Sequence, residues 1–203
     1  DLKILAINLY INILEKKPEY NQTEIEHYCK IGADIGDLKL IIKYYNFKHT
    51  GMNTNLEEAK IYSKKAADKS HNESMLFYSM LLKNCSENAT KKIMKESNFY
   101  LEKAVKHQYV DAIYEYSQRL KNGYGMKVNM KKSDEYLMKA ADLGCKKAMI
   151  EYVSNHMNKK SSKYIDILKE DPKYTSFVQY HKSLSNYNSF ISANLQIKIN
   201  KIQ

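Results

Sequence analysis

The sequence predicts an all-α protein in which pairs of helices are stacked into a solenoid. Only six Gly and two Pro occur in 203 residues, and such sparse punctuation favours long helices over a sheet with many turns. A short Lys-Ala-Ala-Asp-like segment recurs at spacings of 34, 38 and 36 residues, which is the period of a two-helix repeat. Tyrosines stand at fixed distances from that segment in four copies.

The recurring segment predicts the second helix of each pair. Its copies share a small anchor residue, at Gly32, Ala66, Ala104 and Ala140. A tyrosine stands four positions before each anchor, at Tyr28, Tyr62, Tyr100 and Tyr136. A spacing of four places the ring and the small residue on one face of a helix.

A related pattern predicts the first helix of the following pair. Eight positions after each anchor comes a small residue or its equivalent, at Leu40, Ser74, Ala112 and Ala148. Four positions later another tyrosine follows, at Tyr44, Tyr78, Tyr116 and Tyr152. Small residues let helices approach closely while large rings fill the space beside them. One such pair cannot bury its apolar face alone, so we expect neighbouring pairs to stack.

The pattern is most complete in residues 112–144. Its defining positions are Leu120, Gly123, Gly125, Tyr136, Ala140, Ala141 and Gly144. This combination resembles the Sel-one-like repeat (SLR) family, a relative of the tetratricopeptide repeats, although Ser133 stands where that family has Ala. The resemblance implies a right-handed α/α superhelical solenoid of helix-turn-helix repeats. The two glycines are expected to supply positive φ or close approach at a tight turn.

The resemblance covers roughly residues 6–156 and implies five repeats, at about 1–36, 37–70, 71–108, 109–144 and 145–180. Residues 181–203 are expected to form a C-terminal capping helix or tail. Within the second repeat, Thr54 and Glu57 have the spacing of a capping box, with Thr54 as the cap. Because the chain starts without Met or a signal-peptide pattern, it has the appearance of a fragment or a processed product.

The charge leaves two classes of partner open. The formal net charge of +10 and the 18 Tyr favour an RNA-binding helical repeat as the alternative function. However, lysines are spread along the chain near acidic residues, and Arg119 is the one Arg among 33 basic residues. Arg is the usual choice for bidentate contacts with phosphates and bases, so nucleic acid is the less favoured partner.

No residue set in the sequence indicates catalysis, a metal site or a cofactor. The six His lack a metal-binding spacing, and we expect them to be structural or solvated. Cys29, Cys85 and Cys145 are widely spaced, which predicts packing residues rather than a disulfide framework or a zinc knuckle. No nucleophile, base and oxyanion set can be assembled, so the chain is not expected to be an enzyme.

The candidate partner-binding surface is a stripe on the first helices. It comprises the positions −1, +3 and +6 from the small residue. These are Lys39, Lys43, Asn46, Glu73, Phe77, Met80, Asp111, Glu115, Gln118, Lys147, Glu151 and Ser154. The stripe changes from basic to apolar to acidic to mixed, as expected of a groove that binds an extended or helical peptide. A merely solvated face is the alternative.

The predicted function is therefore a non-catalytic scaffold or adaptor that binds other proteins or peptides in a solenoid groove. The sequence contains no run of about 20 apolar residues that would span a membrane. It leaves the compartment open: a cytoplasmic location is favoured and the secretory pathway stays possible. It also leaves the oligomeric state open.

Overall fold

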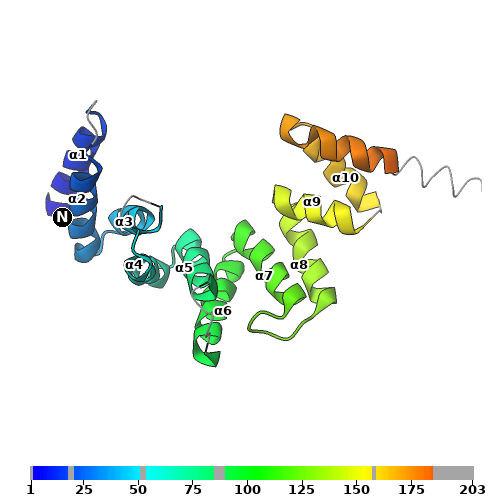
Figure 1. Ribbon diagram of the computed structural model, residues 1–203, viewed down its shortest axis with the longest axis horizontal. Helices are drawn as coiled ribbons and strands as arrows, with labels where there is room; N and C mark the ends of the chain where they lie inside the picture. Colours follow the sequence, from blue (N-terminus) through cyan, green and yellow to red (C-terminus); the bar gives the residue numbers. More distant parts are fainter. Residues whose placement is uncertain (1, 18–20, 51–53, 85–89, 157–158, 185–203) are drawn as a thin grey trace, which may run out of the picture. The chain divides into compact units, whose positions relative to one another are not determined.

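The protein is all-helical throughout the part of the chain that its computed structural model describes, namely residues 2–17, 21–50, 54–84, 90–156 and 159–184 (Figure 1). The prediction of an all-α fold is confirmed. Residues 175–184 are also helical. The remaining elements are α1 (Leu2–Glu15), α2 (Gln22–Ile35), α3 (Leu38–Thr50), α4 (Leu56–Asp68), α5 (Asn72–Asn84), α6 (Lys91–Lys106), α7 (Val110–Asn122), α8 (Met130–Asp142), α9 (Lys146–Asn155), α10 (Lys159–Leu168) and the 3₁₀ helix η1 (Pro172–Tyr174).

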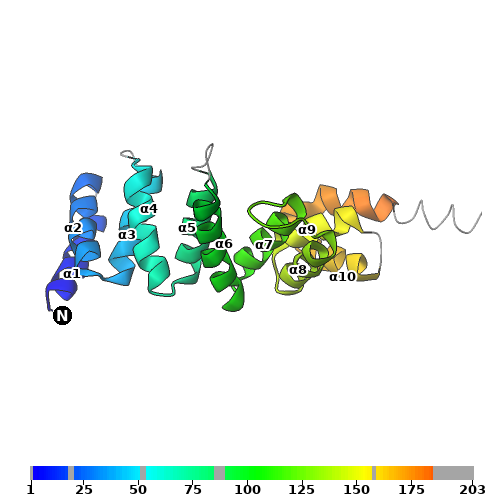
Figure 2. The ribbon, with the colours of Figure 1, turned by 90° about the horizontal axis from the view of Figure 1, so that it is seen from below.

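The chain divides into two compact units. The N-terminal unit comprises residues 1–112 and 124–127, and the C-terminal unit comprises residues 113–123 and 128–203. In the N-terminal unit each helix from α1 to α6 packs against the next one along the chain, which Figure 2 shows as successive hairpins. In the C-terminal unit α9 packs against both α8 and α10. We call the odd-numbered helices α1 to α9 the first helices, and the even-numbered helices α2 to α10 the second helices.

Most second helices begin at a polar cap. The side chains of Asn21, Asn55, Thr90 and Asn129 each accept a hydrogen bond from the backbone N–H three residues later. These bonds satisfy donors that the first turn of a helix leaves unpaired. The cap expected at Thr54 is therefore wrong by one residue, because Asn55 caps α4 through the N–H of Glu58.

The turns after four second helices share a left-handed residue. Gly36, Ser70, Gln108 and Gly144 all have positive φ, between 59° and 99°. This conformation closes a helix by pairing its last carbonyl groups, and glycine adopts it without strain. Gly123 and Gly125 also have positive φ, in the turn between α7 and α8.

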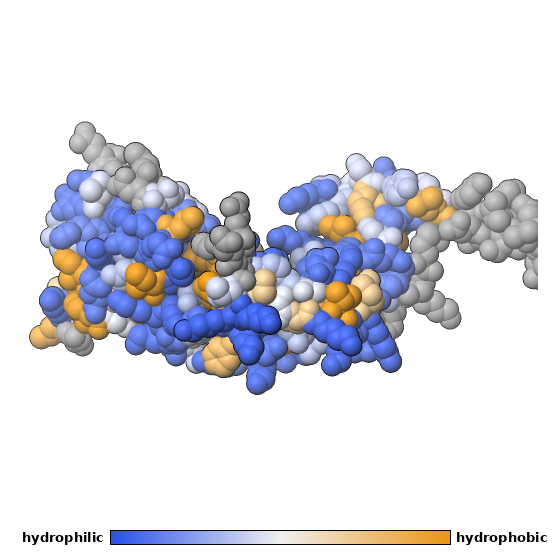
Figure 3. Space-filling view, turned by 60° about the horizontal axis from the view of Figure 1, so that its bottom comes forward, coloured by the Kyte–Doolittle hydropathy of each residue, from blue (hydrophilic) through white to orange (hydrophobic). Residues whose placement is uncertain are grey.

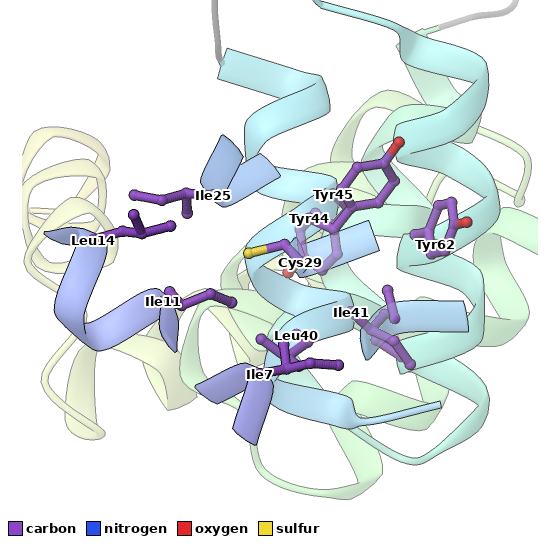
Figure 4. Close-up of a cluster of buried hydrophobic side chains, with 12 residues drawn as sticks. Ile7, Ile11, Leu14, Ile25, Cys29, Leu40, Ile41, Tyr44, Tyr45 and Tyr62 are labelled. Carbon is purple, nitrogen blue, oxygen red and sulfur yellow. The ribbon is translucent and has the colours of Figure 1, made fainter. Parts of the chain in front are cut away.

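The core of the N-terminal unit lies between its successive helices. Ile7, Ile11 and Leu14 of α1 lie on the side facing Ile25 of α2, and the cluster continues through Ile41 of α3 (Figure 4). Each fully buried side chain of this size contributes roughly 1.5–3 kcal/mol relative to exposure. Cys29 and Cys145 are both buried with free thiols, in the manner of small apolar residues. Cys85 and residues 185–203 of the expected C-terminal cap or tail lie outside the described residues.

Candidate functional site

Tyrosine pairs join the two helices of every repeat. In each pair a ring from the first helix contacts a ring from the second helix edge to face. The pairs are Tyr10–Tyr28, Tyr44–Tyr62, Tyr78–Tyr100, Tyr116–Tyr136 and Tyr152–Tyr164, with ring centroids 4.7–5.3 Å apart. Aromatic pairs prefer this geometry because the positive edge of one ring meets the negative face of the other. Eight of these ten tyrosines are the ones that mark the repeat in the sequence, whereas the sequence analysis missed Tyr10 and Tyr164.

In three repeats the hydroxyl of the second-helix tyrosine bonds to the preceding second helix. Tyr62 Oη donates to Asp34 Oδ1 at 2.5 Å, Tyr164 Oη donates to Asp142 Oδ1 at 2.9 Å, and Tyr100 makes the same bond to Asp68. Burial, followed by the hydrogen bond to Asp34, raises the pKa of Tyr62. Because this tyrosine stays protonated, it acts as a donor that links one repeat to the next.

The first-helix tyrosine bonds to the second helix of its own repeat. Tyr44 Oη donates to Glu58 Oε2 at 3.0 Å, and Tyr78 Oη donates to Glu96 Oε1 at 3.0 Å. These glutamates precede the second-helix tyrosine by four residues, and the aspartates follow the anchor by two. The sequence analysis missed both acidic partners, although their fixed offsets from the repeat signature are a signal that could have revealed them. For Tyr136 the corresponding positions carry Lys106, at the end of the third repeat, and Lys132, in the fourth.

In the N-terminal unit some residues of the predicted stripe are exposed, and others contact residues of the same or a neighbouring helix. Its exposed members are Lys39, Asn46, Glu73, Met80 and Asp111. By contrast, Lys43 Nζ of α3 contacts Glu15 Oε1 of α1 at 2.5 Å. Phe77 of α5 is half-buried, stacked on Tyr45 with ring centroids 4.9 Å apart, and it meets the His49 ring edge to face at 4.7 Å.

In the C-terminal unit the stripe contains a polar cluster around Glu151. Gln118 Nε2 donates to Glu151 Oε2 at 2.7 Å, and Lys121 Nζ contacts Glu151 Oε1 at 2.8 Å. Burial and the bond to Glu151 raise the pKa of Tyr114 to about 12. Glu115 accepts a bond from Arg119 Nε at 3.1 Å. Lys147 and Ser154 are the exposed members of this part of the stripe.

One register rule connects these contacts. Positions are counted from the small residue of each first helix, which in α1 is Ala6, four positions before Tyr10. The residue at +3 contacts the residue at +9 of the preceding first helix. Lys43–Glu15, Phe77–His49 and Glu151–Lys121 all obey it. The +3 position therefore links repeats, while the −1 positions and the +6 positions at Asn46, Met80 and Ser154 are exposed.

Within the described ranges, no group of three or more His, Cys, Asp or Glu is arranged to hold a metal ion. None of the helices in that part of the chain is long and apolar enough to cross a membrane. A half-buried ion-pair cluster does occur: Lys48 Nζ lies 2.5 Å from Glu26 Oε1 and 3.4 Å from Glu58 Oε2. It joins α2, α3 and α4, so its role is to hold neighbouring helices together.

Stacked helix pairs with recurring tyrosine–carboxylate contacts define a helical-repeat protein of the solenoid class. Among solved structures, one match is c5321, a protective antigen of uropathogenic Escherichia coli strains that displays an SLR fold. It has a TM-score of 0.73 and 14% identity, and the match covers 91% of this chain and 42% of that chain. Another is a Sel1 repeat protein from Oxalobacter formigenes, with a TM-score of 0.63, 18% identity, and 70% of this chain and 41% of that chain covered.

The chain therefore has the SLR fold, as the repeat signature predicts. It spans about two fifths of the length of the two solved structures. No protein-family model matches the sequence, and comparison with curated proteins gives no match.

Proposed function

We propose that the chain is a non-catalytic scaffold that binds other proteins or peptides along the stripe of its first helices. The observation that carries this proposal is the variation of the exposed stripe positions on a constant framework. Lys39 is basic, Glu73 and Asp111 are acidic, and Met80 is apolar, whereas the tyrosine pairs recur in each repeat. A repeat protein achieves specificity in this way, by changing surface residues while its packing residues stay alike.

The charges of the structure favour protein over nucleic acid as the partner. Arg119 is 0% exposed and bonded to Glu115, so the one Arg of the sequence is inaccessible to phosphate. Several lysines are already engaged with carboxylates, among them Lys43 and Lys121. Glu73 and Asp111 on the stripe would repel a phosphate backbone.

The tyrosine hydroxyls and the carboxylates that they bond to support a structural role over a catalytic one. Tyr62 and Glu58 each bond to other helices of the repeat array and thereby hold hairpins together. On the face shown in Figure 3, hydrophobic residues form small separate areas among hydrophilic ones, which suits a surface that contacts partners through mixed chemistry.

The test compares proteins captured by the wild-type chain with those captured by a stripe variant. Lys39→Glu combined with Met80→Asp alters two exposed stripe positions in the N-terminal unit. Lys95→Glu on α6 is the matched control, because it reverses an exposed charge away from the stripe. We expect a partner that the control retains and the stripe variant loses. Equal capture by all three proteins would argue against the stripe as the binding surface.

A second measurement separates the RNA alternative. An RNA ligand held through phosphates would lose affinity steeply as salt increases, by roughly one power of ten for each phosphate contact per tenfold change in salt concentration. We expect only weak binding of single-stranded RNA at physiological salt, unchanged by Lys39→Glu. Tight, salt-sensitive RNA binding together with no captured protein would replace the scaffold by the RNA-binding function.

A further inference from the structure

The outward side of α6 carries a row of lysines around one exposed phenylalanine. Its residues follow one another at spacings of three or four, which places them on one side of a helix. The opposite side of α6 is buried and includes Leu101 and Ala104, so the row points away from the core. We call this set the basic row; its members are Lys92, Lys95, Phe99, Lys103 and Lys106.

The lysines of the basic row carry charge that the chain does not pair. Three of them are exposed and Lys103 is half-buried. Within the described ranges none of the four makes an ion pair. Of the two acidic residues of α6, Glu96 is already bound to Lys64 Nζ at 2.6 Å, so Glu102 is the exposed carboxylate beside the row. Four lysines therefore stand against one carboxylate, and the row attracts anions.

The corresponding positions of other second helices have mixed chemistry. Counted from the second-helix tyrosine, the row occupies −8, −5, −1, +3 and +6. At +6, Asp68 and Asp142 bond to the tyrosine of the next repeat, whereas α6 has Lys106 there. A carboxylate of the repeat framework is thus replaced by a further lysine, so packing of the repeat does not explain the row. The five positions read Thr54, Glu57, Ile61, Lys65 and Asp68 in α4, and Val128, Lys131, Glu135, Lys139 and Asp142 in α8.

Large apolar side chains project among these charges. Phe99 stands in the middle of the basic row and is 59% exposed. Ile61 holds the same register position in α4 and is 54% exposed. The two helices are neighbours within the N-terminal unit, because Lys64 of α4 bonds to Glu96 of α6. Exposed apolar side chains bordered by lysines are typical of a helix face that lies on the headgroup region of a bilayer.

We propose that the basic row of α6, together with Ile61 of α4, binds the surface of a bilayer that contains anionic lipids. Clusters of roughly four to eight lysines on a helix are attracted to anionic headgroups. The lysine stems lie along the apolar boundary while their ammonium groups stay among the headgroups. Phe99 and Ile61 enter the boundary between headgroups and acyl chains.

Side-chain chemistry favours a bilayer over RNA and over an acidic protein. A single strand of RNA is held by rings that stack on successive bases, but Phe99 is the one ring of the row, and Ile61 cannot stack. The lysines also lack the planar fork with which Arg contacts phosphates and bases. A protein partner is held in register by complementary charges of both signs, whereas every charged member of the row is a lysine. A bilayer needs no register and accepts aliphatic and aromatic side chains alike.

The chain contains no Trp, so a single introduced Trp reports on its own surroundings. Phe99→Trp keeps an aromatic side chain in the middle of the basic row. Met130→Trp is the matched control, at a residue that is 53% exposed in the C-terminal unit. Each 203-residue variant is mixed with vesicles of phosphatidylcholine, with or without phosphatidylserine as about one third of the lipid. Co-sedimentation measures binding, and a shift of the Trp emission to shorter wavelength measures insertion.

We expect both Trp variants to bind the phosphatidylserine vesicles and only Phe99→Trp to change its emission. Lys92→Gln combined with Lys95→Gln should weaken binding about 10- to 30-fold, because each lysine near anionic headgroups contributes a factor of about 5. Phe99→Ser should weaken binding about 3- to 10-fold through lost insertion. The helical circular-dichroism signal should be retained, since these three side chains are exposed in the folded chain.

The charge control is Lys131→Gln combined with Lys132→Gln. It removes the same charge from exposed positions in the first turn of α8, in the C-terminal unit. We expect it to change vesicle binding less than about 3-fold, because charges distant from the contact are screened by salt. Binding of the wild-type chain should also fall as the ionic strength increases.

Four results would overturn the proposal. The first is equal binding to vesicles with and without phosphatidylserine. The second is an equal loss of binding in the two double lysine variants, because total charge rather than the row would then decide. The third is an emission change of Phe99→Trp that a single-stranded uridine oligonucleotide produces and the vesicles do not, which would assign the row to RNA. The fourth is loss of a captured protein in Lys95→Glu alone, because a protein would then occupy the row.

This proposal and the scaffold proposal can fail separately. The vesicle measurements alter residues of α6 and α8 and leave the stripe residues Lys39 and Met80 unchanged. Conversely, Lys39→Glu combined with Met80→Asp leaves the basic row intact.

Discussion

Gly32 of α2 and Leu40 of α3 share one space between two adjacent helices. A Cβ built on Gly32 would lie 2.0 Å from Leu40 Cδ1, which is far inside van der Waals contact. The other repeats carry Ala at the anchor and Ser or Ala at the facing position, as in Ala66 with Ser74. At Gly32 and Leu40 the smaller residue lies on α2 and the larger one on α3. Leu40 can therefore stand where the other copies have Ser or Ala, because Gly32 has no side chain to occupy the same space.

This relationship predicts a compensating pair of substitutions. Gly32→Ala should lower the free energy of unfolding by about 1–3 kcal/mol through overpacking. Leu40→Ala alone should cost about 2–5 kcal/mol through lost burial and a cavity. Urea denaturation of both single variants and the double variant measures the coupling. We expect the double variant to be more stable than the sum of the single effects predicts, and simple additivity would show that the two side chains do not compete for space.

The hydrogen bond between Tyr62 and Asp34 predicts a modest stabilising link between repeats. Tyr62→Phe keeps the ring contact with Tyr44 and removes only the hydroxyl, so it should cost about 0.5–1 kcal/mol. Because Asp34 is partly solvated, its carboxylate can regain water in the variant. Thermal unfolding checks the loss. In an Asp34→Asn background the tyrosine substitution should cost less, and an unchanged cost would assign the effect to packing.

The ion pair between buried Arg119 and half-buried Glu115 predicts a large effect within the C-terminal unit. Arg119→Ala removes the buried guanidinium that bonds to Glu115 Oε1 and leaves a cavity in its place, at a cost of about 3–5 kcal/mol. Arg119→Met fills a similar volume without charge and, combined with Glu115→Gln, should recover part of that stability. Chemical denaturation of the C-terminal unit, followed by hydrogen exchange in α7, distinguishes the variants. A loss below about 1 kcal/mol in Arg119→Ala would contradict the assignment.

His181 predicts a pH dependence of the C-terminal unit. Burial lowers the pKa of His181 below the 6.5 of an exposed histidine, and its Nδ1 atom is buried without a hydrogen-bond partner in the described structure. The folded state therefore favours the neutral ring, whereas the unfolded chain binds a proton as the pH falls below about 6.5. Above about pH 6.5 the ring is neutral in both states and the folded state keeps its full stability. As the pH falls below the pKa of His181 in the unfolded chain, proton binding by the unfolded chain lowers the free energy of unfolding.

The measurement is the melting temperature of wild type and His181→Phe between pH 8 and pH 5. The wild type should lose more stability than the variant over this range, because Phe keeps the apolar packing against Phe177 without a titrating nitrogen. The other histidines and the carboxylates titrate equally in both proteins, so the difference between the two curves isolates His181. Parallel curves would show that the ring is already hydrated in the folded state.

Helix positions and their pairing could be predicted because the relevant signals are local. Tyr62 and Ala66 lie on one face of a helix by their spacing alone, and Tyr44 follows Leu40 in the same way. The capping residue of α4 was wrong because Thr54 and Asn55 both have suitable side chains, and only the backbone path selects Asn55. Phe77 was expected on an exposed stripe, but its stacking on Tyr45 depends on a helix 32 positions away.

The sequence by itself determined the helix-pair repeat, its period and eight of the ten tyrosines that hold it together, since these follow from side-chain spacing along a single helix. Tertiary structure alone decided which carboxylates receive the tyrosine hydroxyls and which stripe positions stay exposed. Those properties depend on contacts between residues about 30 positions apart, such as Tyr62 with Asp34, and such contacts exist only once neighbouring hairpins have packed.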